Sequence, residues 1–371
     1  MKVLMLSTDA NIAKEGSAVL GRMMDYGSVV EELHIIVATI GGTSKMRVID
    51  TNVFAYPTAS RTKIGSRLGL FFRGLNIRAD IITSQDPFET GFIAWVLARL
   101  KNMKLELQVH TDFLNPYFLS ESFLNHIRAW MARFLLPKAE GVRAVSNRVR
   151  VSFAEKKIRL KKPLEVLPIF IDVKSIRKTE STFSLREKFP QLDTIILMVS
   201  RLTKEKEINR AINIFSSLAK KYQKTGLIIV GNGPEKKNLE SFVKKNLLYK
   251  SVFFLPWQYE TMWLYKSADI FLLTSRYEGF GMSIVEAAAS NLPILSTEVG
   301  VIGDLLKPEE DVLACPVGNE ACLARQLERL IFDVPLRRKL AHNAQKSLDV
   351  LIIDKKEYLS RLRANWDRLL I

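Results

Sequence analysis

Two glutamates, Glu278 and Glu286, bracket a Gly-Phe-Gly turn in the stretch Glu-Gly-Phe-Gly-Met-Ser-Ile-Val-Glu. A strand-like apolar run, 270–273, precedes the turn and a helix-like run, 284–289, follows it. Open α/β sheets bind ligands at the carboxyl ends of their strands, where glycines let the backbone approach a ligand and helix N–H groups face phosphate or sugar oxygens. This motif alone is equally compatible with a helix start that carries a solvated acid.

Two further strand-to-helix turns carry groups that complement this acidic motif. Arg201 and Lys206 follow the strand-like run 195–199, and two cations at such a turn suit a diphosphate. Another strand-like run ends in Gly-Asn-Gly-Pro, which places Gly231 and Gly233 in a tight turn. Each signal is weak alone, whereas their order and spacing are specific in combination.

In combination, these segments resemble the retaining nucleotide-sugar glycosyltransferases of family 4, also called group 1 glycosyltransferases. The resemblance is close over about residues 190–300 and looser over the first 170. It implies an α/β chain with the GT-B fold, in which two Rossmann-like domains face each other across a cleft. It also implies transfer of a sugar from a nucleoside-diphosphate sugar to a glycan or lipid-linked acceptor, in cell-surface polysaccharide or glycolipid synthesis.

The resemblance also assigns roles to individual residues. Arg201 and Lys206 would neutralise the departing β-phosphate, Glu278 would hold a hydroxyl of the donor sugar, and Glu286 would accept hydrogen bonds from the ribose. His110 ends the strand-like run 105–109 and would touch the transferred sugar, although a lone histidine there is as often structural. The other expected donor-binding residues are Gly16, Gly231, Gly233, Leu255, Phe280, Gly281, Met282 and Ser283. The chain departs from the family at Pro256 and Trp257, where a glycine is common, and at Ser200, which replaces the glycine before the arginine.

No Asp-x-Asp pattern lies at a strand end, so we expect a metal-independent enzyme whose only cofactor-like ligand is the nucleotide sugar. Two alternatives remain within this fold: a nucleotide-sugar epimerase, and a non-catalytic protein that binds nucleotide sugars. A nicotinamide-dependent dehydrogenase is disfavoured, because the turn after Gly231 lacks the third glycine of the dinucleotide fingerprint.

The length and the rhythm of apolar runs predict two domains. The chain has 371 residues, and strand-like runs alternate with helix-length segments in both halves. We expect an N-terminal acceptor-side domain over 1–170, a hinge over 171–192 and a nucleotide-sugar-binding domain over 193–354. Residues 355–371 have a periodic apolar face and would form a closing helix on the N-terminal domain.

The net charge of +16 falls mainly in residues 1–190. Basic residues surround apolar ones over 61–78 and again over 128–162, which is typical of contact with an anionic membrane or of a solvated face. Binding to nucleic acid is disfavoured, because no recognised nucleic-acid-binding motif accompanies the charge. No apolar run is long enough to span a bilayer, and the N-terminus reads as a buried strand, so we expect a cytoplasmic location with peripheral contact at the inner membrane face.

Two local features have purely structural interpretations. Cys315 and Cys322 have no histidine near them in the sequence, and we expect both to be reduced residues of the core. The segment Asp-Pro-Phe-Glu at 86–89 predicts a helix with Asp86 as its N-cap and Glu89 as the capping-box acid.

Overall fold

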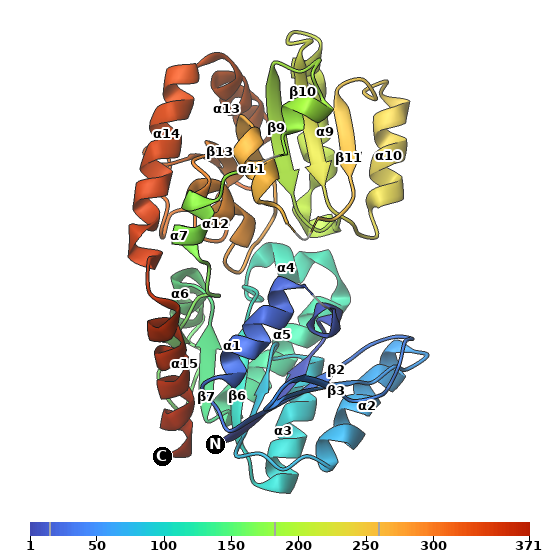
Figure 1. Ribbon diagram of the computed structural model, residues 1–371, viewed down its shortest axis with the longest axis vertical. Coiled ribbons are helices and arrows are strands. Elements are labelled where there is room, and N and C mark those ends of the chain that lie inside the picture. Colours follow the sequence, from blue (N-terminus) through green and yellow to red (C-terminus); the bar gives the residue numbers. More distant parts are fainter. Residues whose placement is uncertain (15, 182, 259) are drawn as a thin grey trace. The chain divides into compact units, whose positions relative to one another are not determined.

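The computed structural model describes residues 1–14, 16–181, 183–258 and 260–371. The expected loop around Gly16 and the expected hinge each include one residue outside these ranges. The chain divides into two compact units (Figure 1): unit 1 comprises Met1–Phe170 and Asp354–Ile371, and unit 2 comprises Ile171–Ile353. Within the described ranges, no helix is both long and apolar enough to span a membrane.

Unit 1 is built on a sheet in the order β3-β4-β2-β1-β5-β6-β7-β8, parallel except for β3. Its strands are β1 (Lys2–Ser7), β2 (Glu32–Val37), β3 (Arg47–Asp50), β4 (Val53–Pro57), β5 (Ile81–Ser84), β6 (Lys104–Val109), β7 (Gly141–Ala144) and β8 (Glu165–Val166). Its helical segments are η1 (Ala10–Ala13), α1 (Ala18–Gly27), α2 (Lys63–Leu75), α3 (Glu89–Lys101), α4 (Pro116–Glu121), α5 (Phe123–Leu135), η2 (Leu136–Lys138), α6 (Asn147–Glu155) and α15 (Lys355–Leu370).

Unit 2 has an all-parallel sheet in the order β11-β10-β9-β12-β13-β14. Its strands are β9 (Thr194–Val199), β10 (Thr225–Val230), β11 (Val252–Leu255), β12 (Ile270–Leu273), β13 (Ile294–Thr297) and β14 (Leu313–Cys315). Its helical segments are α7 (Val173–Lys178), α8 (Leu185–Lys188), η3 (Lys204–Lys206), α9 (Ile208–Ala219), α10 (Lys236–Lys245), α11 (Met262–Ser267), α12 (Met282–Ala289), α13 (Glu320–Phe332), α14 (Val334–Ser347) and η4 (Leu348–Leu351).

Both units have the strand order of a doubly wound Rossmann sheet. In unit 2 the chain winds outward from β9 to β11 and then returns to add β12 on the other side of β9. In unit 1 the same reversal places β5 beside β1. Loops diverge at such a reversal and leave a crevice at the carboxyl ends of the two central strands, which is where ligands bind in these folds. The prediction of Rossmann-like α/β domains is therefore confirmed.

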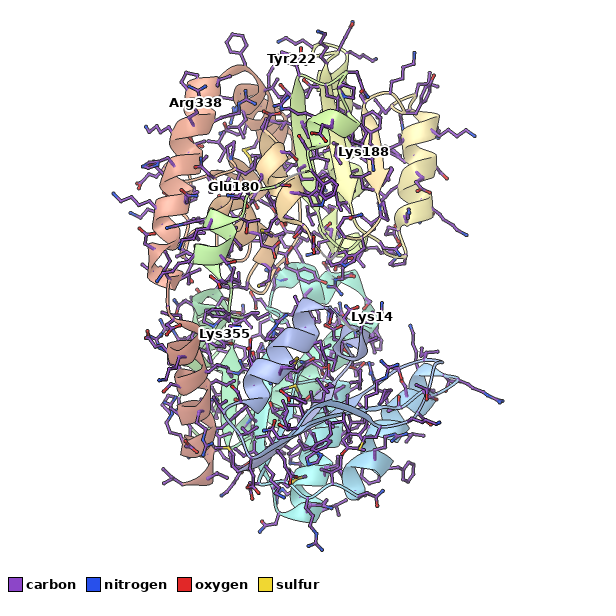
Figure 2. All side chains as sticks on the ribbon, viewed as in Figure 1. Lys14, Glu180, Lys188, Tyr222, Arg338 and Lys355 are labelled. Atoms are coloured by element: carbon purple, nitrogen blue, oxygen red, sulfur yellow. A yellow bond between two sulfur atoms is a disulfide. The ribbon has the colours of Figure 1, made fainter. Side chains whose placement is uncertain are left out.

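The C-terminal helix α15 belongs to unit 1, where it packs against β6. Figure 2 labels Lys355 at its first turn, where the ammonium lies 3.1 Å from the carboxylate of Asp25 on α1. The apolar face predicted from the sequence is buried, with Leu362 and Trp366 fully inaccessible to solvent.

A buried carboxylate, Glu106 of β6, anchors α15. Its oxygens accept hydrogen bonds from Asn365 Nδ2 at 2.6 Å and from Trp366 Nε1 at 3.1 Å, both on α15. The hydroxyl of Thr83 on β5 donates a third bond at 2.6 Å, and Arg143 Nε of β7 lies 3.6 Å away. Glu106 is fully buried and Arg143 almost so, and each is the other's counter-charge. The network ties three strands to the last helix of the chain.

Two predictions about local structure are wrong. Cys315 and Cys322 form a disulfide between β14 and the first turn of α13, because the short connection brings their Cα atoms to 5.9 Å. Asp86 does not cap α3, which begins at Glu89 after Phe88. The Asp86 carboxylate instead accepts bonds from the Phe88 N–H and the Thr90 hydroxyl, and burial raises its pKa.

The Glu106 network predicts a large stability effect for one substitution. Glu106→Ala should lower the free energy of unfolding by about 3–5 kcal/mol, because it leaves the buried Arg143 cation without a counter-charge and frees both α15 donors. Thermal unfolding of the full chain should show a midpoint lower by roughly 10 °C. The matched control is Glu357→Ala on the same helix, whose exposed ion pair with Arg361 should contribute less than about 1 kcal/mol. Equal midpoints for the two variants would contradict the assignment.

Candidate functional site

Two of the ligand-binding residues predicted in the second half, Lys206 and Glu278, meet at the carboxyl ends of β9 and β12. Lys206 lies in η3, directly after the β9 turn, and its ammonium donates a 2.5 Å hydrogen bond to Glu278 Oε1 in the β12–α12 loop. Ser275 donates to the same oxygen at 2.8 Å. Both charged side chains are mostly buried, with exposures of 12% and 13%. The two residues are 72 apart in sequence and meet because β9 and β12 are neighbours in the sheet.

Backbone contacts fix this pair in place. The Thr274 hydroxyl donates to the Lys206 carbonyl at 2.9 Å, and the Arg276 N–H donates to the Glu205 carbonyl at 2.8 Å. Glu207 precedes the first residue of α9 and has a left-handed backbone conformation. Its carboxylate accepts a 2.6 Å hydrogen bond from Arg276 Nε. Since these three hydrogen bonds join the two loops, the Lys206–Glu278 geometry is set before any ligand binds.

Arg201 lies in the same turn but points differently. Its side chain is 72% exposed and its guanidinium lies 3.5 Å from Glu205. It therefore does not contact Glu278 as Lys206 does. An exposed guanidinium four residues from its partner is weakly held, so Arg201 can turn toward an anion at the carboxyl edge of β9.

Glu286 has a separate environment from Glu278. It lies on α12 and accepts a 2.8 Å hydrogen bond from the hydroxyl of Tyr265 on α11. Burial raises the pKa of Glu286 to about 6, while the bond from Tyr265 acts in the opposite direction. Tyr265 itself is buried, and its pKa is raised well above the ordinary value by burial and by the nearby carboxylate.

The glycines of the site are required mainly by contact between loops. A Cβ on Gly231 would lie 1.9 Å from the Ser200 carbonyl oxygen, and one on Gly233 would lie 2.3 Å from the Leu202 carbonyl oxygen. These glycines thus let the β10–α10 turn press against the backbone on both sides of Arg201. The Gly231 N–H also donates to the carbonyl of Leu255 at the end of β11, which joins two of the predicted site residues.

The turn into α12 contains the other predicted donor-binding residues. Gly281 has a left-handed φ of +87° and forms the N-cap, so Met282 and Ser283 are the first two helical residues. Phe280 is buried. A Cβ on Gly300, in the loop after β13, would lie 2.4 Å from the Phe280 carbonyl oxygen and 3.2 Å from Glu278 Cβ. Gly300 therefore allows the Glu278 loop to pack closely.

His110 and Gly16 belong to unit 1. Gly16 has a left-handed φ of +73° in the loop before α1. His110 follows β6, and its Nε2 contacts Gln108 Oε1 at 2.9 Å. The Gln108 amide nitrogen donates in turn to Thr83, whose hydroxyl donates to Glu106. This series fixes the amide orientation, so His110 Nε2 carries the proton and donates, which leaves Nδ1 as an acceptor. Burial, with Arg143 and Arg22 nearby, lowers the pKa of His110 to about 3 and keeps the ring neutral.

Sequence reasoning missed Tyr265, Ser275 and Gly300. Ser275 and Gly300 each follow a predicted strand, and a survey of small or polar residues at strand ends would have found them. Tyr265 left no such signal, because it reaches Glu286 from a different helix. Among the described residues, no group of three or more His, Cys, Asp or Glu side chains is placed to hold a metal ion.

The sequence is similar to those of several curated proteins. The chain is 26% identical to N-acetyl-alpha-D-glucosaminyl L-malate synthase of Bacillus anthracis over 220 residues, which is 59% of this chain and 57% of that protein. It is 27% identical to alpha-monoglucosyldiacylglycerol synthase of Streptococcus pneumoniae over 307 residues, 72% of this chain and 69% of that protein. The chain thus aligns with only part of the length of either relative.

Solved structures support the fold over the whole chain. Sucrose-phosphate synthase of Thermosynechococcus elongatus superposes with a TM-score of 0.83 at 16% identity, covering 100% of this chain and 99% of that one. HepE of Anabaena, solved with UDP and glucose, has a TM-score of 0.78 at 19% identity, covering 99% of each chain. The two Rossmann-like units are those of the GT-B fold. Residues 181–347, which carry the Lys206–Glu278 pair, match the model of glycosyl transferases group 1.

Proposed function

We propose that the protein is a retaining glycosyltransferase that moves a sugar from a nucleoside-diphosphate sugar to a glycan or lipid-linked acceptor without a metal ion. The observation that carries this proposal is the Lys206–Glu278 pair, held at the point where the β9–β12 sheet reverses its winding. A preformed cation at that place suits a diphosphate, and a carboxylate beside it suits sugar hydroxyls.

The reaction breaks the bond between the anomeric carbon and the β-phosphate oxygen and forms a bond from that carbon to an acceptor hydroxyl. Negative charge grows on the departing phosphate, and the acceptor proton passes to it. Lys206 and Arg201 stabilise that charge, which is the work a metal ion would otherwise do. Glu278 accepts a hydrogen bond from the donor sugar, and no side chain is assigned as a nucleophile.

The remaining predicted residues form the rest of the donor site in this proposal. Glu286 accepts hydrogen bonds from the ribose hydroxyls, which its ionised form can do with both oxygens. The N–H groups of Met282 and Ser283 at the start of α12 face phosphate or sugar oxygens. In unit 1, the neutral His110 has Nδ1 as a hydrogen-bond acceptor, which suits a sugar hydroxyl.

Support for a glycan or lipid-linked acceptor comes from the relatives. One is named for glucosylation of a diacylglycerol, and another, matched over 44% of this chain, is a capsular polysaccharide biosynthesis glycosyltransferase of Staphylococcus aureus. HepE was solved with UDP-glucose, which makes UDP the first nucleotide to test. An epimerase would turn over the donor with no acceptor present, and a non-catalytic protein would bind it without turnover.

Loss of Lys206 should slow sugar transfer. Lys206→Ala should lower kcat by about 10²–10³-fold, because it removes a preorganised donor to the departing phosphate. Transfer is measured with UDP-, GDP- and ADP-sugars, with Mg²⁺ and with EDTA, and thermal shift reports donor binding in parallel. Lys220→Ala, an exposed lysine at the end of α9, is the matched control and should be as active as the unmodified chain. Full activity of Lys206→Ala, or activity abolished by EDTA, would refute the proposed role of the cations.

A second prediction concerns pH and Glu286. Because the carboxyl pKa is about 6, affinity for an intact nucleotide sugar should fall between pH 7 and pH 5, by about tenfold at the lower value. The folded chain binds this proton more tightly than the unfolded chain, in which the carboxyl has its ordinary pKa of 4.5. As the pH falls from 7 to 5, the contribution of Glu286 to the free energy of unfolding should therefore rise, while donor binding weakens over the same interval. Calorimetric titrations and unfolding midpoints at several pH values test both trends.

Two variants make the pH test specific. Tyr265→Phe removes the hydrogen bond that lowers the Glu286 pKa, so the midpoint of the affinity curve should move to higher pH. Glu286→Gln should bind weakly with a flat profile over the same range. A tenfold pH dependence that survives in Glu286→Gln would assign the titration to another group.

A further inference from the structure

Three neighbouring helices of unit 1 carry their large apolar side chains on the outside. On α2 the buried residues are Ser66, Leu70 and Gly74, whereas the exposed face holds Ile64, Leu68, Phe72 and Leu75. On α5 the buried residues are Asn125, Ala129, Ala132 and Leu135, whereas the exposed face holds Phe123, Ile127, Trp130 and Phe134. A surface helix of a soluble domain normally has the reverse pattern.

The exposed aromatic residues of α3 and α5 form one cluster. Trp95 of α3 contacts Phe92 and Phe134, with ring centroids 5.7 Å apart in both pairs. Trp130 stacks on Phe134 at 6.0 Å. Trp130 is 67% exposed and Phe123, one end of the same stripe, is 81% exposed. Large exposed patches of this kind mark sites of contact with a partner or a membrane.

Helix α2 extends the same surface. It packs beside α3, where a Cβ on Gly74 would lie 2.4 Å from Leu97 Cδ1, and Figure 1 shows the two helices side by side in the blue and cyan part of the chain. We call the outward faces of α2, α3 and α5 the aromatic–basic face.

Cations surround these apolar residues and acids are few. Segment 61–78 contains five basic residues, Arg61, Lys63, Arg67, Arg73 and Arg78, and no acid, and segment 122–138 likewise contains no acid. Lys138 Nζ lies 4.0 Å from the Phe134 ring centroid, and the Arg99 guanidinium lies 6.0 Å from that of Trp95. Glu89 is neutralised by Arg128 at 2.9 Å. The face is therefore apolar at its centre and positively charged around it.

We propose that the aromatic–basic face is a docking surface for the headgroup region of an anionic lipid bilayer. Exposed aromatic rings insert at the boundary between headgroups and acyl chains, and lysine and arginine side chains bind the anionic headgroups. The charge decides the occupant: a second copy of this chain would bring an equally positive face against it, and neutral lipid would leave the cations without partners. The proposal concerns a surface outside the donor site and does not depend on the transferase activity.

Vesicle flotation tests the proposal with the full chain. Vesicles of phosphatidylcholine alone are compared with vesicles that contain 30% phosphatidylglycerol, at low and at high salt. The chain should float with the anionic vesicles at low salt and be released at high salt, because exposed charges are screened. Equal flotation with both compositions, or none with either, would overturn the proposal.

Matched variants locate the contact. Phe123→Ala combined with Trp130→Ala should weaken binding by at least about tenfold, whereas Phe332→Ala in unit 2, where the side chain is equally exposed at 81%, should have no effect. Lys63→Glu with Arg133→Glu should weaken binding by more than about tenfold, against Lys244→Glu with Lys245→Glu on α10 as a control. All these side chains are at the surface, and unchanged unfolding midpoints will show that the variants fold.

Fluorescence and hydrodynamics exclude the other occupants. Lipids brominated near the headgroup should quench the emission of the unmodified chain and should quench Trp130→Phe markedly less. Sedimentation without lipid should give the same mass for the unmodified chain and for Phe123→Ala with Trp130→Ala. A dimer that these two substitutions dissociate would replace the membrane by a second copy of the chain.

Discussion

The buried carboxylate of Glu106 is the interaction on which unit 1 depends. It offsets Arg143, receives two donors from the last helix and one from Thr83, and through Thr83 and Gln108 it sets the proton position on His110. A carboxylate in an apolar core is tolerated only when its charge is paired and its oxygens accept hydrogen bonds, and here both conditions are met by residues far apart in sequence. One constraint thus holds the C-terminal helix on the sheet and orients a candidate binding residue.

Unit 2 also has a mostly buried charge pair, at the carboxyl edge of its sheet. Lys206 and Glu278 are mostly buried and balance each other, so neither charge has to be stabilised by bulk water. The loops that carry them are joined by backbone and side-chain bonds from Thr274 and Arg276. Rigid placement of this kind lowers the entropy that a ligand must lose to reach a reactive geometry. Arg201, by contrast, is exposed and only weakly held beside Glu205.

The two glutamates of the 278–286 motif illustrate how position decides chemistry. Both are glutamates in one short segment, but Glu278 lies against a lysine and a serine, whereas Glu286 lies against a buried tyrosine. Burial without a cation raises the pKa of Glu286, so the residue becomes sensitive to pH in a range where most carboxyls are not. Position also decides the role of apolar side chains. The exposed apolar residues of α2 and α5 would belong to the core if these helices were rotated about their axes.

The sequence by itself determined the fold class, the alternation of strands and helices in both halves and the buried face of α15, because apolar periodicity is a local property and survives without knowledge of neighbours. It misplaced the start of α3, which depends on the hydrogen bonds that the Asp86 carboxylate accepts. It named the candidate residues Lys206, Glu278 and Glu286 but not their partners. Only the tertiary structure decided that Lys206 pairs with Glu278, that Tyr265 holds Glu286 and that the two cysteines are bonded, because each contact depends on which strands and helices become neighbours. Which strands and helices become neighbours depends on the packing of the whole sheet, and no single segment of the chain determines it.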